Sequence, residues 1–233
     1  MKPQIILTVT SGRSGTGYLH NILKRNRHIH SEHESSIPDQ NFWNKVFKKI
    51  QDEGVKIYAE TSHLINKGFI EPLIYDFEIV PDLIILKRDH RSVAKSLTQL
   101  GTVPHRTAVG KKYLISPEDS QSLTTLTKFQ DLTDYQLNYW YCLEIEQRQI
   151  YYKKLINEFN GKFYETSIDK LKNGDIINIF KEFKIPYDEK FLNKNDSFIN
   201  STVNSKNNSK SKLEIGNLDE QEKIVRSRII IKE

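Results

Sequence analysis

A short polar stretch near the N-terminus carries the residue types that bind anions. Residues 11–17 read Ser-Gly-Arg-Ser-Gly-Thr-Gly, between the apolar residues 5–9 and a segment with apolar side chains at Leu19, Ile22 and Leu23. A strand, a glycine-rich turn and a helix in this order form loops that hold phosphate groups. Glycine allows the backbone to approach an anion closely, and the N-terminus of the following helix adds partial positive charge. The stretch therefore predicts an anion-binding loop.

Two positions distinguish this loop from that of the metal-dependent nucleotide triphosphatases, whose pattern is Gly-x4-Gly-Lys-Ser/Thr. Gly12 and Gly17 have the required spacing, but Tyr18 and Leu19 stand where the lysine and the metal-binding hydroxyl are needed. The replacement removes a positive charge from the terminal phosphates and a ligand from the magnesium ion. A dinucleotide loop fits less well, because Gly-x-Gly-x-x-Gly does not occur in this stretch.

A pair of cations follows a later predicted strand. Residues 83–86 are a fully apolar run of the kind buried in parallel sheets, and Lys87 and Arg88 come directly after it. A nucleotide triphosphatase has a metal-binding aspartate at the end of this strand, whereas Asp89 lies beyond the two cations. The sequence therefore predicts a phosphate-rich ligand that is bound without a metal.

Together the two stretches resemble the motifs of the sulfotransferases that use 3′-phosphoadenosine 5′-phosphosulfate (PAPS). The first is Arg-Ser-Gly-Thr at residues 13–16, and the second is Arg88 and Ser96, eight residues apart after the later strand. In that family the first motif holds the 5′-phosphosulfate and the second holds the 3′-phosphate. The resemblance implies a P-loop-type fold and a donor site made of Gly12, Arg13, Ser14, Gly15, Thr16, Gly17, Tyr18, Arg88 and Ser96.

The resemblance covers residues 4–101 and is closer to the bacterial and Golgi-type carbohydrate sulfotransferases than to the cytosolic ones. The Arg-Lys-Gly-x-x-Gly element near the C-terminus of the cytosolic branch is absent, and residues 193–212, rich in Asn, Ser and Lys, stand about where it would be. We expect this tract to be a flexible loop, with a basic flap over the bound anion as the alternative.

The resemblance implies in-line transfer of a sulfuryl group to an acceptor hydroxyl, without a metal. A carbohydrate acceptor is favoured by analogy with this branch, and a peptide hydroxyl suits the residues equally. Arg13 is expected to stabilise the negative charge that builds up on the leaving phosphate oxygen. Because the pKa of arginine stays above about 12, we assign Arg13 no proton transfer.

A general base is expected to activate the acceptor, and two residues compete for this role. The segment that begins at Glu34 resembles the catalytic-glutamate segment of Golgi-type and tyrosylprotein sulfotransferases. His63, in Thr-Ser-His-Leu, resembles the catalytic histidine of cytosolic members. We favour Glu34, because Arg13 in the loop and the missing C-terminal element both point away from the cytosolic branch. Glu60 and His33 are further candidates.

Two other functions are consistent with the loop. A nucleotide kinase or triphosphatase with a degenerate loop would bind ATP together with magnesium. A non-catalytic nucleotide-binding module would keep the loop without turnover. The presence of Arg13, Glu34 and His63 in one chain favours an enzyme over such a module.

The composition limits the partners. A net charge of +5 favours anionic ligands, but no arginine-rich block indicates a nucleic acid. A single cysteine, Cys142, excludes an internal disulfide and a cysteine zinc site, and His28, His30 and His33 match no zinc spacing. We therefore expect no metal.

The length and hydropathy bear on domain organisation and location. A chain of 233 residues with 37% hydrophobic content suits one α/β domain over residues 1–233. No apolar run reaches the roughly 18 residues that a membrane span requires. The first strand begins almost at once, so no signal peptide is expected and a cytoplasmic location is the default.

Strands and helices alternate along the chain, which predicts a three-layer α/β fold with a parallel sheet and ligands at the carboxyl ends of its strands. Strands are expected at residues 5–9, 55–59, 83–86 and 162–166. Helices are expected at residues 16–26, 38–50, 133–159, 176–183 and 218–229, and a further one ends at Gly101. Residues 66–78 are expected to be a helix or an irregular crossover, and residues 102–132 a loop or lid. The aromatic side chains around Trp140 are expected in the core.

Overall fold

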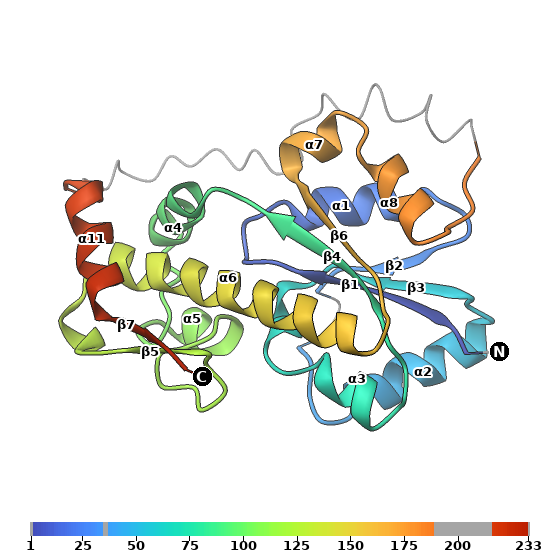
Figure 1. The fold of residues 1–233 in the computed structure, drawn as a ribbon, viewed down its shortest axis with the longest axis horizontal. Helices are drawn as coiled ribbons and strands as arrows, with labels where there is room; N and C mark the ends of the chain where they lie inside the picture. Colours follow the sequence, from blue (N-terminus) through green and yellow to red (C-terminus); the bar gives the residue numbers. More distant parts are fainter. Residues whose placement is uncertain (1, 35–36, 189–215, 233) are drawn as a thin grey trace.

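The fold is built on five parallel strands in the order β2-β3-β1-β4-β6 (Figure 1). The computed structural model describes residues 2–34, 37–188 and 216–232. The strands are β1 (Gln4–Val9), β2 (His30–Glu32), β3 (Ile57–Glu60), β4 (Asp82–Lys87) and β6 (Phe163–Ser167). Because all five run in the same direction, the loops that follow them gather along one edge of the sheet. The predicted α/β fold with a parallel sheet is confirmed.

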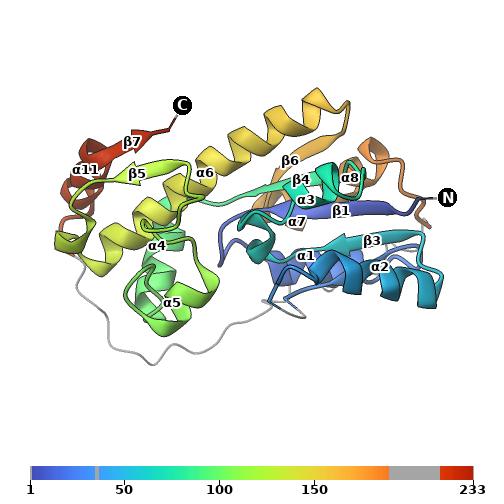
Figure 2. The ribbon, with the colours of Figure 1, turned by 90° about the horizontal axis from the view of Figure 1, so that it is seen from below.

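Helices cover both faces of this sheet (Figures 1 and 2). The α-helices are α1 (Thr16–Leu23), α2 (Phe42–Glu53), α3 (Glu71–Tyr75), α4 (His90–Gln99), α5 (Ala108–Tyr113), α6 (Asp134–Glu158), α7 (Ile168–Lys172), α8 (Ile176–Glu182) and α11 (Leu218–Arg228). Two 3-10 turns, η1 (His63–Asn66) and η2 (Phe129–Asp131), complete the connections. In the described ranges, no helix has the length and apolar character that crossing a membrane requires.

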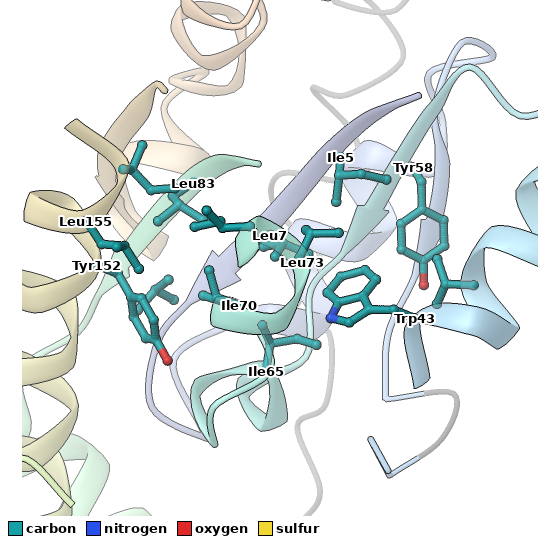
Figure 3. Close-up of a cluster of buried hydrophobic side chains, with 14 of the residues drawn as sticks. Ile5, Leu7, Trp43, Tyr58, Ile65, Ile70, Leu73, Leu83, Tyr152 and Leu155 are labelled. Carbon is teal, nitrogen blue, oxygen red and sulfur yellow. The ribbon is translucent and has the colours of Figure 1, made fainter. Parts of the chain in front are cut away.

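Alternating side chains of the central strands divide the core into two halves. On one face, Ile5 and Leu7 of β1 pack with α2, α3 and the C-terminal half of α6 (Figure 3). On the other face, Ile6 packs with α1, α7 and α8. In β4, Leu83 joins the first half and Ile84 the second. An uninterrupted apolar strand is thus buried on both sides, and the three layers follow from it.

The long helix α6 extends beyond the sheet (Figure 2). Tyr152 in its C-terminal half belongs to the core beneath the sheet, whereas Trp140 lies in a separate cluster with side chains of α4 and α11. Strands β5 (Thr124–Leu126) and β7 (Ile229–Ile231) pair antiparallel beside this cluster. The aromatic residues around Trp140 are therefore core residues, as predicted.

Several short elements are missing from the sequence prediction, among them β2, α5, β5 and α7. Strand β2 has only three residues, all polar, and it exists because it pairs with β3. Residues 102–132, expected as a loop or lid, contain α5 and β5. Each element is too short for its periodicity to stand out, so tertiary contacts determine it.

Predicted helix boundaries are also corrected. The helix expected at residues 16–26 ends at Leu23. The helix expected at residues 38–50 begins at Phe42, because a turn precedes it in which the amide of Phe42 donates to the carbonyl of Asp39 at 2.9 Å. The helix expected at residues 218–229 ends at Arg228, because three successive isoleucines favour a strand and pair with β5. Residues 193–212, expected as a flexible loop or a basic flap, lie outside the described residues.

Candidate functional site

A cavity of about 840 Å³ opens at the carboxyl ends of the central strands. It is lined by the β1–α1 loop (residues 10–15) and the start of α1, by residues that follow β2, β3 and β4, and by α4, α5 and α7. The predicted site residues in its lining are Gly12, Arg13, Gly15, Thr16, Gly17, Tyr18, Glu34, His63, Arg88 and Ser96. Of the predicted donor-site residues, Ser14 alone does not line the cavity: it is buried, and its hydroxyl lies 2.7 Å from that of Ser11.

The β1–α1 loop is fixed from two sides. The hydroxyl of Thr10 donates to the carbonyl of Leu86 in β4 at 2.7 Å. The amide of Gly12 donates to the hydroxyl of Tyr141 at 3.2 Å, and Tyr141 is fully buried in α6. This role of Tyr141 could not be predicted from the sequence, because its position in an aromatic helix indicates only a core residue.

The backbone of this loop needs glycine at one position above all. Gly15 has φ +97°, and a Cβ atom there would lie 2.7 Å from Cδ1 of Ile168 at the start of α7. Left-handed φ values cost an L-residue roughly 1–2 kcal/mol. Gly15 therefore combines the required conformation with a close approach of α7.

The start of α1 is open to an anion. In the described part of the chain no side chain caps α1, and its first turn has no acidic residue, whereas Thr16 and Gly17 line the cavity. Helix α4 differs, because Asp89 caps it by accepting a hydrogen bond from the amide of Ser92 at 2.7 Å. The aspartate beyond the two cations thus serves as a helix cap. The positive end of α1 points into the cavity without a counter-charge from its own turn.

The two cationic motifs form one wall. Arg88 donates a hydrogen bond to the backbone carbonyl of Arg13. The Nε atom of Arg13 donates to the hydroxyl of Ser96 at 3.1 Å. Ser92, one turn before Ser96 on α4, lines the same cavity. Residues far apart in the sequence therefore present two guanidinium groups and two hydroxyls to a common space.

Lys87 differs from its neighbour Arg88. Its ammonium group pairs with Glu165 of β6, which also pairs with Lys153 of α6. These ion pairs help to lower the pKa of Glu165 against the opposing effect of burial. The sequence suggests that both Lys87 and Arg88 are available to bind an anionic ligand. This interpretation is corrected for Lys87, because Glu165 is already its carboxylate partner.

The two candidate bases are in direct contact. Glu34 follows β2 and His63 follows β3, and because these strands are neighbours the side chains meet, with His63 Nδ1 2.8 Å from Glu34 Oε1. The hydrogen bond from His63 lowers the pKa of Glu34. An ionised carboxylate can only accept a hydrogen bond, so the proton lies on Nδ1.

Their exposure to the cavity is unequal. The Glu34 side chain is 40% exposed and that of His63 only 10%. His63 Nε2 is buried beside Gly12 and has no hydrogen-bond partner among the described residues. The carboxylate of Glu34 is thus the group of this pair that a molecule in the cavity reaches more readily.

The other two candidate bases are placed differently. His33 lines the cavity, and its Nδ1 lies 3.1 Å from the hydroxyl of Thr61. Burial lowers the pKa of His33. Glu60 is only 2% exposed and does not line the cavity, so it does not face a bound molecule.

A further wall of the cavity was not predicted. Helices α4 and α5 contribute apolar side chains to it, namely Leu97, Leu100, Val109, Tyr113 and Leu114. Helix α7 adds Lys172 to the lining of the cavity. The weak periodicity of residues 102–132 concealed α5, and this helix gives the cavity an apolar side next to its cationic one.

No group of three or more His, Cys, Asp or Glu side chains is placed to hold a metal ion within the ranges that the structure describes. His30 lies 3.3 Å from carboxylates of both Glu32 and Glu53. Cys142 is buried in α6, and this burial raises the pKa of its thiol.

Comparison with known proteins gives no relative from which a function could be transferred. No protein-family model, no curated protein and no solved structure matches this chain. The residues of the cavity are therefore the evidence for function.

Proposed function

We propose that this protein is a sulfotransferase that moves a sulfuryl group from PAPS to an acceptor hydroxyl without a metal. One observation carries the proposal: the β1–α1 loop, the Arg88–Ser96 pair and the hydrogen-bonded Glu34 and His63 all line the same cavity. An anion-binding loop, a second anion site and a candidate base are the three parts that such a transfer needs.

The donor is proposed to bind along the cationic wall. The start of α1 and Arg13 suit the 5′-phosphosulfate, because Arg13, Thr16 and Gly17 line the cavity and a helix N-terminus favours an anion. Arg88 and Ser96 suit the 3′-phosphate, as the resemblance implies. A nucleotide kinase remains the second candidate, but the loop has Tyr18 where a kinase needs its lysine.

In the proposed reaction the acceptor oxygen attacks the sulfur atom of the donor. The new sulfur–oxygen bond forms as the bond between sulfur and the phosphate oxygen breaks, which releases adenosine 3′,5′-bisphosphate. Arg13 stabilises the negative charge that develops on the leaving oxygen. The acceptor proton passes to Glu34, which is ionised at neutral pH because its hydrogen bond with His63 lowers its pKa.

Glu34 is proposed as the base because of its exposure. Its second carboxylate oxygen is available in a side chain that is partly open to the cavity, whereas Nε2 of His63 is buried beside Gly12. In this arrangement His63 orients Glu34 through Nδ1. The acceptor is proposed to be a carbohydrate hydroxyl, for which the resemblance of the sequence is the support.

The test compares two adenine nucleotides on two arginine variants. Arg88→Ala is expected to weaken binding of adenosine 3′,5′-bisphosphate about 10- to 100-fold, because it removes a charge-assisted hydrogen bond to phosphate. Binding of adenosine 5′-phosphosulfate, which has no 3′-phosphate, should change far less. Isothermal titration calorimetry measures both affinities.

Arg27→Ala is the matched control, because Arg27 is exposed, pairs with Asp188 and does not line the cavity. It removes the same charge and should leave both affinities unchanged. An equal loss for the two nucleotides in Arg88→Ala would contradict the proposed 3′-phosphate site.

A further inference from the structure

A buried carboxylate, that of Glu60, lies between the chain segments that lead to Glu34 and to His63. Glu60 is the last residue of β3, and its side chain is enclosed between β2, β3 and the turn that follows. Its Oε1 accepts a hydrogen bond from the amide of Ser62 at 2.9 Å, and its Oε2 lies 3.3 Å from the hydroxyl of Tyr58. The proposed reaction gives this group no task, since it does not reach the cavity.

Glu60 connects the two chain segments that carry the candidate bases. In the register of β2 and β3, Glu60 lies opposite Glu32, and the amide of Thr61 donates to the carbonyl of Glu32 at 3.1 Å. The amide of Ser62 donates to the Glu60 carboxylate, and the backbone of Glu34 acts to lower the pKa of Glu60 against the larger effect of burial. The carboxylate thus holds the amide adjacent to His63, and it senses the backbone of Glu34.

The backbone of Glu34 requires such an anchor. Glu34 has φ +50°, which is the left-handed region and is unfavourable for a residue with a side chain. Such a conformation persists where the surrounding structure fixes it, and here β2 is tied to β3 up to Glu32, whose carbonyl accepts from the amide of Thr61.

We propose that Glu60 is a positioning residue, whose buried carboxylate holds the Ser62 amide and so sets the turn that carries His63, which brings His63 Nδ1 within hydrogen-bond distance of Glu34 Oε1. Its effect on the reaction rests on the proposed function, whereas its effect on the Glu34–His63 contact does not.

The proton inventory around Glu60 indicates which substitution preserves this role. Tyr58 has one hydroxyl proton, but two carboxylates lie within hydrogen-bond distance of its hydroxyl oxygen. These are Glu32 at 3.1 Å and Glu60 at 3.3 Å. Glu32 is paired with Lys49 of α2. Burial raises the pKa of Glu60 to about 7, so below that pH a protonated Glu60 can donate to Tyr58 while Tyr58 donates to Glu32.

A glutamine reproduces this protonated state. Its amide nitrogen can donate to Tyr58 while its oxygen still accepts from the Ser62 amide. Leucine has a similar volume and offers no acceptor. The pair Glu60→Gln and Glu60→Leu therefore separates the anchor from the charge, and it also separates a positioning residue from a base that must lose its proton.

The experiment observes His63 directly in the unliganded protein. With 15N-labelled histidine, NMR is expected to show a proton on Nδ1 shifted downfield by its hydrogen bond with a carboxylate, assigned by its loss in His63→Asn. Glu60→Gln should keep this signal, and Glu60→Leu should lose it. If Glu60→Leu does not fold, Glu60→Asp takes its place, because the shorter side chain withdraws the carboxylate from the Ser62 amide.

The catalytic arm measures kcat and the affinity for adenosine 3′,5′-bisphosphate. Glu60→Leu should lower kcat about 10- to 100-fold through misplacement of the base, while the affinity stays within about twofold and Glu60→Gln restores most of the rate. Glu71→Leu is the matched control: Glu71 accepts a hydrogen bond from Tyr152 at 3.1 Å, away from the cavity, and its loss should lower stability without changing the His63 signal.

Persistence of the His63 signal in folded Glu60→Leu would overturn the positioning role, whatever the activity. Loss of kcat in Glu60→Gln with an intact His63 signal would also overturn it, because the carboxylate would then be needed as a base. Failure of the wild-type protein to bind the bisphosphate would refute the proposed function and leave the NMR result to decide the role of Glu60.

Discussion

A carboxylate that accepts a hydrogen bond from a histidine stays ionised at neutral pH, and Glu34 is in this position. As the proposed base, it should contribute about 100-fold or more to the rate. Glu34→Gln is therefore expected to lower kcat by at least that factor. The affinity for adenosine 3′,5′-bisphosphate should change little, because the donor is proposed to bind at the cationic wall. Steady-state kinetics and calorimetry measure the two effects.

His63→Asn provides the comparison for this prediction. An asparagine amide can keep a donor near the position of Nδ1, whereas Nε2 is lost. If Glu34 is the base, this variant should retain more activity than Glu34→Gln. If it loses as much activity as Glu34→Gln or more, His63 is the base and the assignment has to be reversed.

The single residue Glu60 should make the unfolding free energy of the protein depend on pH. Its pKa is raised from about 4.5 to about 7 in the folded protein, mainly by burial. The folded state therefore binds this proton more tightly than the unfolded state. The resulting stability is fully present below pH 4.5 and is lost as the pH rises through about 7.

Urea denaturation of the wild type and Glu60→Gln at pH 5 and pH 8 measures this dependence. Glutamine does not titrate, whereas Glu60 loses its proton between these two pH values. From pH 5 to pH 8, the unfolding free energy of the wild type should therefore fall by about 1–3 kcal/mol relative to that of Glu60→Gln. A difference between the two proteins that stays constant with pH would show that Glu60 titrates near its ordinary pKa.

At the scale of elements, α6 braces the β1–α1 loop through Tyr141. Tyr141→Phe leaves the amide of Gly12 without its acceptor, which should lower the unfolding free energy by about 1–2 kcal/mol. The loop should also lose order, so binding of adenosine 3′,5′-bisphosphate should weaken by about threefold or more. Thermal denaturation and calorimetry measure these changes.

Tyr152→Phe is the control for this effect, because Tyr152 is also buried in α6 and donates its hydroxyl proton to Glu71 instead. It should lower stability to a similar degree and leave the affinity unchanged. Equal losses of affinity in both variants would mean that α6 affects the site only through general stability.

The elements that the sequence predicts are those whose pattern is decided locally. Strands β1 and β4 are uninterrupted apolar runs, and α6 is long and begins with a capping box of Thr133 and Gln136, so both strands and the helix can be anticipated. Strand β2 and helix α5 could not be, because a few residues without a clear period form them only against neighbouring elements.

At the scale of the whole molecule, the same division applies to the site. The loop at residues 11–17 and the pair Arg88 and Ser96 are visible as motifs, but nothing in the sequence brings Glu34 and His63 into contact. That contact depends on β2 and β3 being neighbours, just as the contact between Gly12 and Tyr141 depends on the packing of α6. Contacts between residues that are distant in the sequence are set by the topology of the sheet and the packing of helices, so they can be seen only in the folded structure.

The proposed function requires that the cavity binds a PAPS-type nucleotide without a metal, and this binding can be measured directly. The measurement is calorimetric titration of the wild-type protein with adenosine 3′,5′-bisphosphate in the presence of a chelator, beside a titration with ATP and magnesium. We expect the bisphosphate to bind with micromolar affinity, and we expect magnesium to leave this affinity unchanged. Binding of ATP that requires magnesium, with no binding of the bisphosphate, would contradict the proposed function.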